Sequence, residues 1–284
     1  MPLARILTQR GIAAARVHGN HVTPLDLKPA GVHSLSELLS HPDLVELSMS
    51  LPASGEPIEH SQVNWLPPID DQEVWAAGVT YKRSQKARME ESEAAASCYD
   101  RVYTAPRPEI FFKATPNRCS GHLGLLRIRE DATWNVPEPE LALVISRRGQ
   151  IVGYTVGNDM SSRDIEGDNP LYLPQAKVYN QCCGLGPWIA LAHEMPPRES
   201  IEIGLTISRN DASVFEGKTS VSQMARQLED LVQWLMRDND MPHGVFLLTG
   251  TGVVPDSNFT LHRGDIVDIS ISGIGTLTNT IVQG

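Results

Sequence analysis

Residues 135–145 read Asn135-Val-Pro-Glu-Pro-Glu-Leu-Ala-Leu-Val-Ile145, and this stretch decides the fold. Its second half is apolar and β-branched, which predicts a buried strand. Residues two apart on a strand point to the same face, so Glu138 and Glu140 should project side by side. Pro139 cannot donate a ladder hydrogen bond, which places the pair at a strand entrance or an edge. Two carboxylates this close repel each other unless a cation or a proton lies between them.

A third carboxylate follows on a predicted second strand. Asp159 comes directly after Gly153-Tyr-Thr-Val-Gly-Asn158, a short strand pattern that ends in a Gly-Asn turn signal. A hairpin of this length can bring Asp159 back beside the two glutamates. Three hard oxygen ligands completed by water suit Mg2+, Mn2+ or Ca2+ better than zinc. The competing interpretation is that all three are solvated carboxylates at strand ends, since charged side chains are mostly solvated.

The segment after Asn158 favours a functional site over solvated carboxylates. It reads Asn158-Asp-Met-Ser-Ser-Arg-Asp-Ile-Glu-Gly-Asp-Asn-Pro-Leu-Tyr-Leu-Pro-Gln-Ala-Lys-Val-Tyr179. It is dense in charge but also holds several large apolar residues, so it is not typical of a disordered tract. Further distinctive stretches are Arg107-Pro-Glu-Ile-Phe-Phe-Lys-Ala-Thr-Pro116 and Leu248-Thr-Gly-Thr-Gly252.

Together with Glu138-Pro-Glu140, these stretches resemble the catalytic domain of the fumarylacetoacetate hydrolase superfamily, from about residue 74 to residue 284. The resemblance implies that Glu138, Glu140 and Asp159 bind the divalent ion and that Lys177 is the lysine of the site. It also implies an α+β fold that is mainly β, with a mixed β-roll as the catalytic domain. We place this domain at residues 71–284 and a small N-terminal domain at residues 1–70. Members of this family generally assemble, so a homo-dimer or homo-tetramer is expected.

The strand-rich pattern agrees with that fold. The strands expected outside the hairpin cover residues 74–79, 188–191, 201–208, 244–248, 266–272 and 275–282. Helices are expected at 33–39, at 90–99 and, with a capping box at Ser220–Gln223, along the apolar stripe that ends at Leu235. Residues 64–71 contain paired prolines and are expected to form a linker.

Residues 78–87 distinguish between the chemistries of this superfamily. In its hydrolases and decarboxylases, a Gly-Leu-Asn-Tyr-like turn precedes a His-x-x-Glu pair that activates water. The chain reads Gly78-Val-Thr-Tyr-Lys-Arg-Ser-Gln-Lys-Ala87, so Ser84 and Ala87 occupy those two positions. Neither side chain can act as that general base at neutral pH. The segments at 107–119 and 166–177 instead resemble the sugar-acid dehydratase branch, in which the position of Glu109 is an active-site carboxylate.

The resemblance implies a Mg2+-dependent dehydratase of a 2-keto-3-deoxy sugar acid, which would convert 2-keto-3-deoxy-D-arabinonate or a related pentonate to 2,5-dioxopentanoate and water. Lys177 and Glu109 are the expected acid–base pair, with either residue as the base. The side chains expected to bind the substrate are those of Arg163, Thr251, Tyr81 and Lys113. A structural role for Arg163 is equally consistent with the sequence, because arginine readily pairs with neighbouring acids.

Two alternatives stay open at this point. The first is a hydrolase that cleaves a carbon–carbon bond of a 2,4-diketo acid with a base from elsewhere. The second is a non-catalytic protein that binds a metal ion and a keto acid, against which the presence of Glu109 and Lys177 argues. The two enzymes differ in product, because only hydrolysis cleaves the carbon chain.

Composition bounds the partners and the compartment. The chain has 284 residues and a formal net charge of −10, which gives no electrostatic reason to expect nucleic acid or an anionic membrane as a partner. We find no apolar run of transmembrane length and no secretory signal pattern. The four cysteines have no zinc or redox spacing and are expected to be free packing residues, which suits a reducing cytoplasm.

Overall fold

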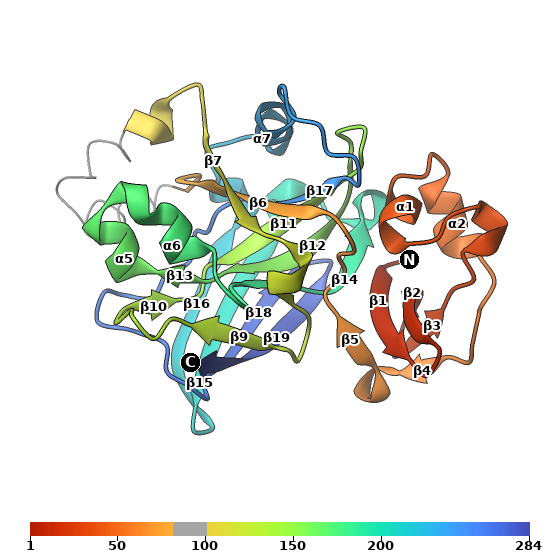
Figure 1. The fold of residues 1–284 in the computed structure, drawn as a ribbon, viewed down its shortest axis with the longest axis horizontal. Helices are drawn as coiled ribbons and strands as arrows, with labels where there is room; N and C mark the ends of the chain where they lie inside the picture. The colour runs from red at the N-terminus through yellow and green to blue at the C-terminus, as the bar shows by residue number, and fades with distance from the viewer. Residues whose placement is uncertain (82–100) are drawn as a thin grey trace.

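The structure is a computed structural model that describes residues 1–81 and 101–284. The fold consists mostly of mixed β-sheets with a few short helices (Figure 1). Ser84, Ala87, Cys98 and the helix expected at 90–99 lie outside the described residues, so those predictions stay untested. None of the described helices is long and apolar enough to span a membrane.

The larger sheet has twelve strands. They are β1 (Leu3–Thr8), β2 (Gly11–His18), β3 (His21–Pro24), β4 (Ile58–Glu59), β5 (Asn64–Leu66), β6 (Glu73–Gly78), β7 (Glu109–Ala114), β8 (Cys119–Ser120), β11 (Pro139–Ile145), β12 (Ile151–Asp159), β14 (Cys183–Leu191) and β17 (Val245–Leu248). The main path runs β4-β3-β2-β1-β14-β12-β11-β17-β6-β7, while β5 pairs with β1 and β8 pairs with β14.

A second sheet has five strands in the order β16-β15-β18-β19-β9. They are β9 (Leu125–Ile128), β15 (Glu202–Arg209), β16 (Ala212–Ser220), β18 (Ile266–Ile271) and β19 (Gly275–Gln283). A two-stranded ladder joins β10 (Asn135–Val136) to β13 (Ser161–Ser162). The α-helices are α1 (Leu35–Leu39), α2 (Leu44–Ser50), α5 (Arg163–Asp168), α6 (Leu173–Lys177) and α7 (Leu228–Leu235).

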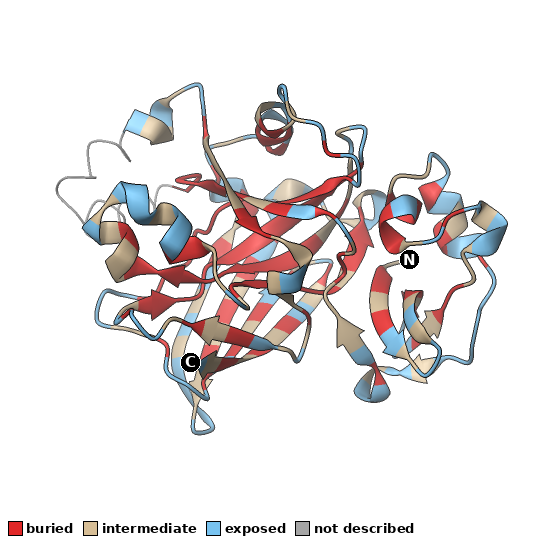
Figure 2. Cartoon of the chain, in the orientation of Figure 1, coloured by how far each residue is buried: buried red, intermediate tan, exposed pale blue. Residues whose placement is uncertain are grey.

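Strand β11 is buried on both of its faces. Leu141 and Leu143 point into a core shared with Leu205 and Ile269 of the second sheet. Val144 lies on the opposite face, in a core that also contains residues of α1. Figure 2 shows this strand as part of a continuous buried band. Full burial of one such side chain contributes about 1.5–3 kcal/mol, so the strand is fixed from both sides.

Residues 1–70 lie on one side of the fold and share the large sheet (Figure 1). Strand β1 pairs with β14 at Leu3 and Ile189, which makes the two parts continuous through hydrogen bonds. Leu38 of α1 packs in the same core as Phe246 of β17. The boundary that we place between residues 70 and 71 stays a prediction.

Several expectations from the sequence are confirmed and two are wrong. Each expected strand is present, and α1 begins after Ser34, whose side chain accepts a hydrogen bond from the backbone of Glu37. The expected linker is wrong at 64–66, which forms β5 and pairs with β1. The expected helix is wrong before Leu228, where a short 3-10 turn is followed by extended backbone. There the backbone of Met224 pairs with Tyr81, and this pairing competes with helix formation.

Candidate active site

The hairpin of β11 and β12 brings the three predicted carboxylates together. Glu140 lies opposite Gly157 in the ladder, and the backbone N–H of Asp159 donates to the carbonyl of Glu138 over 3.0 Å. The side chains are buried, with Glu138 and Glu140 2% exposed and Asp159 1% exposed. One carboxylate oxygen from each residue lies within 4.8 Å of the other two. The interpretation as solvated strand-end carboxylates is therefore wrong.

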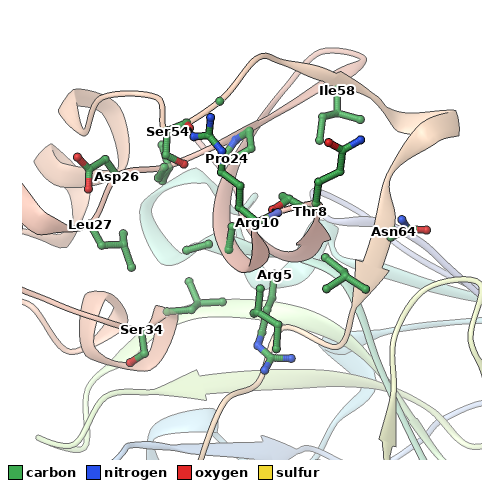
Figure 3. Close-up of a pocket in the computed structure, with 18 of the residues that line it drawn as sticks. Arg5, Thr8, Arg10, Pro24, Asp26, Leu27, Ser34, Ser54, Ile58 and Asn64 are labelled. Carbon is green, nitrogen blue, oxygen red and sulfur yellow. Dashed lines mark hydrogen bonds between the residues drawn. The ribbon is translucent and has the colours of Figure 1, made fainter.

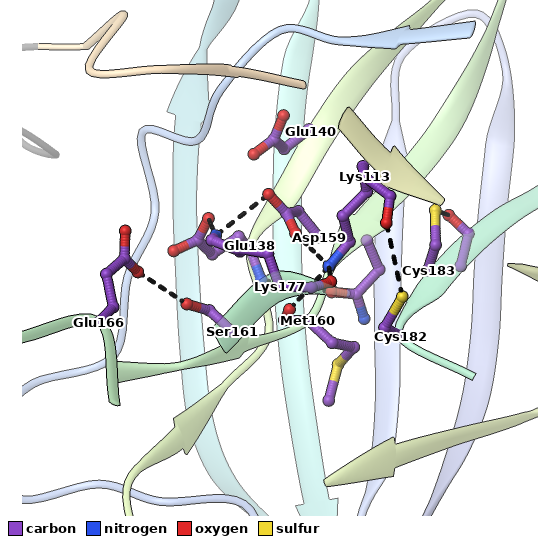
Figure 4. Close-up of polar contacts among 12 residues, drawn as sticks. Lys113, Glu138, Glu140, Asp159, Met160, Ser161, Glu166, Lys177, Cys182 and Cys183 are labelled. Carbon is purple, nitrogen blue, oxygen red and sulfur yellow. Dashed lines mark hydrogen bonds and ion pairs between the residues drawn. The ribbon is translucent and has the colours of Figure 1, made fainter. Parts of the chain in front are cut away.

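Two cationic side chains neutralise Glu138, and Figure 4 shows one of them, Lys177. Its Oε1 lies 2.6 Å from Arg163 Nη2, and its Oε2 lies 2.7 Å from Lys177 Nζ. Lys177 Nζ also lies 3.1 Å from Asp159 Oδ2, so the ammonium group bridges two of the three carboxylates. Lys177 is the last residue of α6 and is completely buried, which fixes its amine at the carboxylates.

Glu140 has a different environment from its two neighbours. Within the described residues it forms no ion pair, and its Oε2 accepts a hydrogen bond of 2.6 Å from the backbone N–H of Gly250. Burial raises the pKa of Glu140 well above its usual range, and the charges of Asp159 and Glu138 raise it further. Glu140 therefore has no ion-paired cationic side chain among the described residues to balance a negative charge.

The lack of a described cationic partner beside Glu140 is consistent with a bound divalent cation. Three buried carboxylates that converge within a few ångströms form the hard oxygen donor set that Mg2+, Mn2+ and Ca2+ prefer. A dication at this position would compensate Glu140 and reduce the repulsion among the three groups. The residues present therefore fit the metal site expected from the sequence.

Gly250 is a residue of this site that the sequence analysis did not single out. Its φ of +91° lies in the left-handed region, and a Cβ at this position would lie 2.0 Å from Thr80 Oγ1. Glycine is therefore required both for the backbone conformation and for the close approach. The usable signal was the Gly in Leu248-Thr-Gly-Thr-Gly252, which marks a place where backbone comes near a side chain.

Lys113 lies on β7 and contacts Asp159. Its Nζ lies 2.6 Å from Asp159 Oδ1 and donates to the carbonyls of Met160 and Lys177 over 2.9 and 2.6 Å. Burial alone would lower the pKa of Lys113, but the charge and hydrogen bond of Asp159, together with the neighbouring Cys182 and Cys183, raise it. All three N–H donors of the ammonium are used inside the protein. These contacts fix the position of Asp159 and of the end of α6. A contact between Lys113 and the substrate stays a prediction.

Glu109 is placed at the edge of the site by β7. It lies opposite Gly78 in the ladder with β6, and a Cβ on Gly78 would come within 2.0 Å of Glu109 Oε2. That oxygen is buried and accepts no hydrogen bond from the described residues. Gly78 lines a small pocket together with the three carboxylates. A buried polar atom without a partner beside such a pocket is typical of a group that acts on a ligand.

The other expected substrate contacts lie around the same pocket. Arg163 and Thr251 line it, although the Thr251 hydroxyl already donates to the carbonyl of Val253 over 2.9 Å. Burial and the charge of Glu140 raise the pKa of Tyr81, which places the phenol near that carboxylate. The structure thus brings these residues to one site, and their contacts with a substrate stay predictions.

Val79 carries backbone strain at the pocket wall. Its φ is +52°, although it is β-branched and buried. A β-branched residue in the left-handed region is a true conformational outlier, and such strain concentrates at functional sites. The sequence gives no sign of this feature, because valine is among the residues least expected there.

A larger cavity lies away from the carboxylates, in the N-terminal part of the chain (Figure 3). Two of its arginines are engaged within the protein: Arg5 Nε lies 2.7 Å from Asp70 Oδ1, and Arg10 Nη1 donates to the carbonyl of Ser54 over 2.9 Å. These contacts hold the cavity wall in place. The three converging carboxylates instead make the smaller pocket the candidate active site.

Comparisons with known proteins identify relatives that are named as dehydratases. A protein of Haloferax volcanii named probable 2-keto-3-deoxyxylonate dehydratase is 50% identical over 214 residues, which cover 75% of this chain and 73% of that protein. The 2-dehydro-3-deoxy-D-arabinonate dehydratase of Saccharolobus solfataricus is 46% identical over 217 residues, with the same coverage of 75% and 73%.

A solved structure covers the whole of this chain and 99% of its own, with a TM-score of 0.84 and 36% sequence identity. It is described as 2-keto-3-deoxy-D-arabinonate dehydratase complexed with magnesium and 2,5-dioxopentanoate. The family described as fumarylacetoacetate (FAA) hydrolase C-terminal matches residues 73–282, which include the hairpin, the three carboxylates and Lys177. The chain belongs to the fumarylacetoacetate hydrolase family.

Proposed function

We propose that this protein is a Mg2+-dependent hydro-lyase that dehydrates a 2-keto-3-deoxy pentonate to 2,5-dioxopentanoate and water. The observation that carries the proposal is the Lys177 ammonium in contact with Glu138 and Asp159, inside a convergent set of three buried carboxylates. The relatives at 46–50% identity are named as dehydratases of such acids, and the related structure contains magnesium and 2,5-dioxopentanoate.

Glu138, Glu140 and Asp159 would hold the ion, with Mn2+ or Ca2+ as possible substitutes. Bound Mg2+ supplies Lewis-acid stabilisation of negative charge on the keto and carboxylate oxygens of the substrate. Lys113 and Arg163 keep Asp159 and Glu138 in place through their ion pairs.

Dehydration needs one group to remove a proton from C3 and another to protonate the departing C4 hydroxyl. We assign the first role to Lys177 Nζ and the second to Glu109. Lys177 has a completely buried amine at the carboxylates, and Glu109 has a buried oxygen without a hydrogen-bond partner among the described residues. Loss of water leaves an unsaturated acid that tautomerises to the C5 aldehyde.

The finer architecture is proposed on the same basis. Residues 71–284 would form the β-roll of this family and residues 1–70 a small N-terminal domain. The protein would assemble as a homo-dimer or homo-tetramer. Sedimentation that gives a 31.2 kDa monomer at micromolar concentration would contradict the assembly.

The function is tested with the purified protein, Mg2+ and separate C5 and C6 2-keto-3-deoxy acids, with product analysis by NMR. We expect a C5 substrate to give 2,5-dioxopentanoate with the carbon chain intact, and Lys177→Met to give none. Pyruvate release from a 2,4-diketo acid, without dehydration of either sugar acid, would favour the hydrolase instead. Tight keto-acid binding without any turnover would favour a binding protein.

A further inference from the structure

Two free cysteines lie opposite each other in the large sheet. Strand β8 runs parallel to β14, and the ladder pairs Cys119 with Cys183. Contact between the two thiols, together with burial, raises the pKa of Cys183 well above its usual range. Neighbouring strands lie about 4.8 Å apart, which falls within the Cα separation that disulfide bonds span. The pair can therefore be joined with little backbone movement.

The two thiols differ in accessibility. Cys183 is 0% exposed, whereas Cys119 is only partly buried, so an oxidant in solution reaches Cys119 first. Cys182 has a different surrounding: its Sγ lies 3.8 Å from the carbonyl oxygen of Lys113 (Figure 4). Cys182 precedes β14 and has no ladder partner in β8, whereas Cys183 is paired with Cys119. Most free cysteines have only a packing role. The pairing of Cys119 with Cys183 across two strands distinguishes these two residues from such cysteines.

The pair is connected to the carboxylate site through β14. Cys183 lies opposite Asp159 in the ladder with β12, and the backbone N–H of Met160 donates to the carbonyl of Cys182 over 3.1 Å. The next pair is tightly packed, because a Cβ on Gly184 would lie only 3.1 Å from the Cβ of Asn158. A displacement of β14 at Cys183 is therefore passed directly to the strand that carries Asp159.

We propose that Cys119 and Cys183 form a reversible disulfide in response to a peroxide, and that this disulfide weakens the divalent-ion site at Asp159. The Cys119 thiolate attacks one peroxide oxygen, the O–O bond breaks, and Cys119 becomes a sulfenic acid. The Cys183 sulfur then attacks the Cys119 sulfur, the S–S bond forms, and the sulfenic oxygen leaves as water. The two thiols lose two electrons and two protons in total, and the peroxide is reduced to two waters. A dithiol reverses the change.

The test uses the full chain with Cys98→Ser, treated with hydrogen peroxide and then digested without reduction for mass spectrometry. Mn2+ binding is measured on the same samples by electron paramagnetic resonance. We expect a peptide pair linked through Cys119 and Cys183, and roughly tenfold weaker Mn2+ binding, the size typical when support of a metal ligand is disturbed. Dithiothreitol should restore both properties.

Two variants control for unspecific oxidation. Cys119→Ser should give no linked peptide and should keep its Mn2+ affinity after peroxide treatment. Cys182→Ala should still give the linked peptide. A native protein in which Cys119 is oxidised but never linked to Cys183 would overturn the proposal, as would a quantitative link that leaves Mn2+ affinity unchanged.

The coupling to the ion rests on the proposed function, and the two can fail separately. A reduced protein that binds no Mn2+ refutes the proposed ion site and the coupling with it. A reduced protein that binds Mn2+ and dehydrates the substrate, but never forms the linked peptide, refutes only the disulfide.

Discussion

Lys177 Nζ lies 2.7 Å from Glu138 Oε2, so the amine that we assign to proton transfer contacts a carboxylate that we also propose as an ion ligand. An ammonium and a divalent cation at one carboxylate repel each other. The ion and the proton on Lys177 therefore compete for the same negative charge. This competition links ion binding to the chemistry of the lysine.

Lys177→Met should lower turnover by about a hundred- to ten-thousand-fold, the usual contribution of a general acid or base. The same variant should bind Mn2+ at least as tightly as the wild type, because a competing positive charge is removed. Steady-state kinetics and titration with Mn2+ measure the two properties. Loss of Mn2+ binding together with activity would show that Lys177 supports the ion site rather than the chemistry.

Glu109→Gln should lower turnover in the same range and leave Mn2+ affinity unchanged, because Glu109 is not one of the three converging carboxylates. Asp131→Asn is the matched control on an exposed acid, and its kinetics should equal those of the wild type. If Glu109→Gln retains more than half of the wild-type rate, the assignment of Glu109 as the acid is wrong. The proton for the departing hydroxyl would then have to come from another group.

Glu140→Gln should abolish tight Mn2+ binding and turnover, since the site loses one charged oxygen ligand. The variant should still fold, because the described hydrogen bond of Glu140 is a single one from a backbone N–H, which glutamine can also accept. Calorimetric titration and thermal unfolding in EDTA separate the two effects. Full activity in EDTA, in either protein, would contradict the proposed ion.

The raised pKa of Glu140 predicts a pH dependence of stability in the ion-free protein. Above the ordinary value of 4.5, an unfolded chain releases this proton while the folded chain retains it. The folded state then binds more protons, so the free energy of unfolding falls as the pH rises above 4.5. Urea unfolding in EDTA should show that the stability of Glu140→Gln relative to wild type increases over this range. A difference that stays constant with pH would contradict the raised pKa.

Gly250→Ala and Gly264→Ala form a matched pair, because both glycines have a φ of +91°. Nothing lies within 4 Å of a Cβ at Gly264, so only the left-handed backbone opposes the added methyl group. The free energy of unfolding of Gly264→Ala should therefore fall by about 1–2 kcal/mol. A Cβ at Gly250 would meet Thr80 Oγ1 at 2.0 Å and the carbonyl of Ala77 at 2.9 Å. Gly250→Ala should therefore be less stable than Gly264→Ala and should lose Mn2+ affinity. Equal unfolding energies for the two variants would show that the Gly250 loop adapts freely.

The hairpin and its carboxylates could be predicted because their signal is local. The apolar run along 141–145 and the Gly-Asn signal before Asp159 indicate two strands of a hairpin without reference to the rest of the chain, and the observed ladder confirms the hairpin. The family resemblance then supplied Lys177 and Glu109, which the structure places at the same pocket or beside it.

Features that depend on distant contacts could not be predicted in the same way. The segment before α7 has a helical apolar pattern, but pairing between Met224 and Tyr81, far apart in the sequence, keeps it extended. The three internal partners of Lys113 and the strained backbone of Val79 likewise arise from packing of separate elements. Ser84 and Ala87, which distinguished between the chemistries, lie outside the described residues, and their significance stays a prediction.

The burial of β11 on both faces has a consequence for how the protein can change. Glu138 and Glu140 lie at the start of a strand whose side chains fill two cores, so any substitution that shifts this strand disturbs the ion site and the folded state together. The packing that stabilises the fold therefore also restricts the substitutions that could move the carboxylates. New substrate preferences can arise in the loops and short helices around the pocket, where a residue can be exchanged without unfolding the sheet.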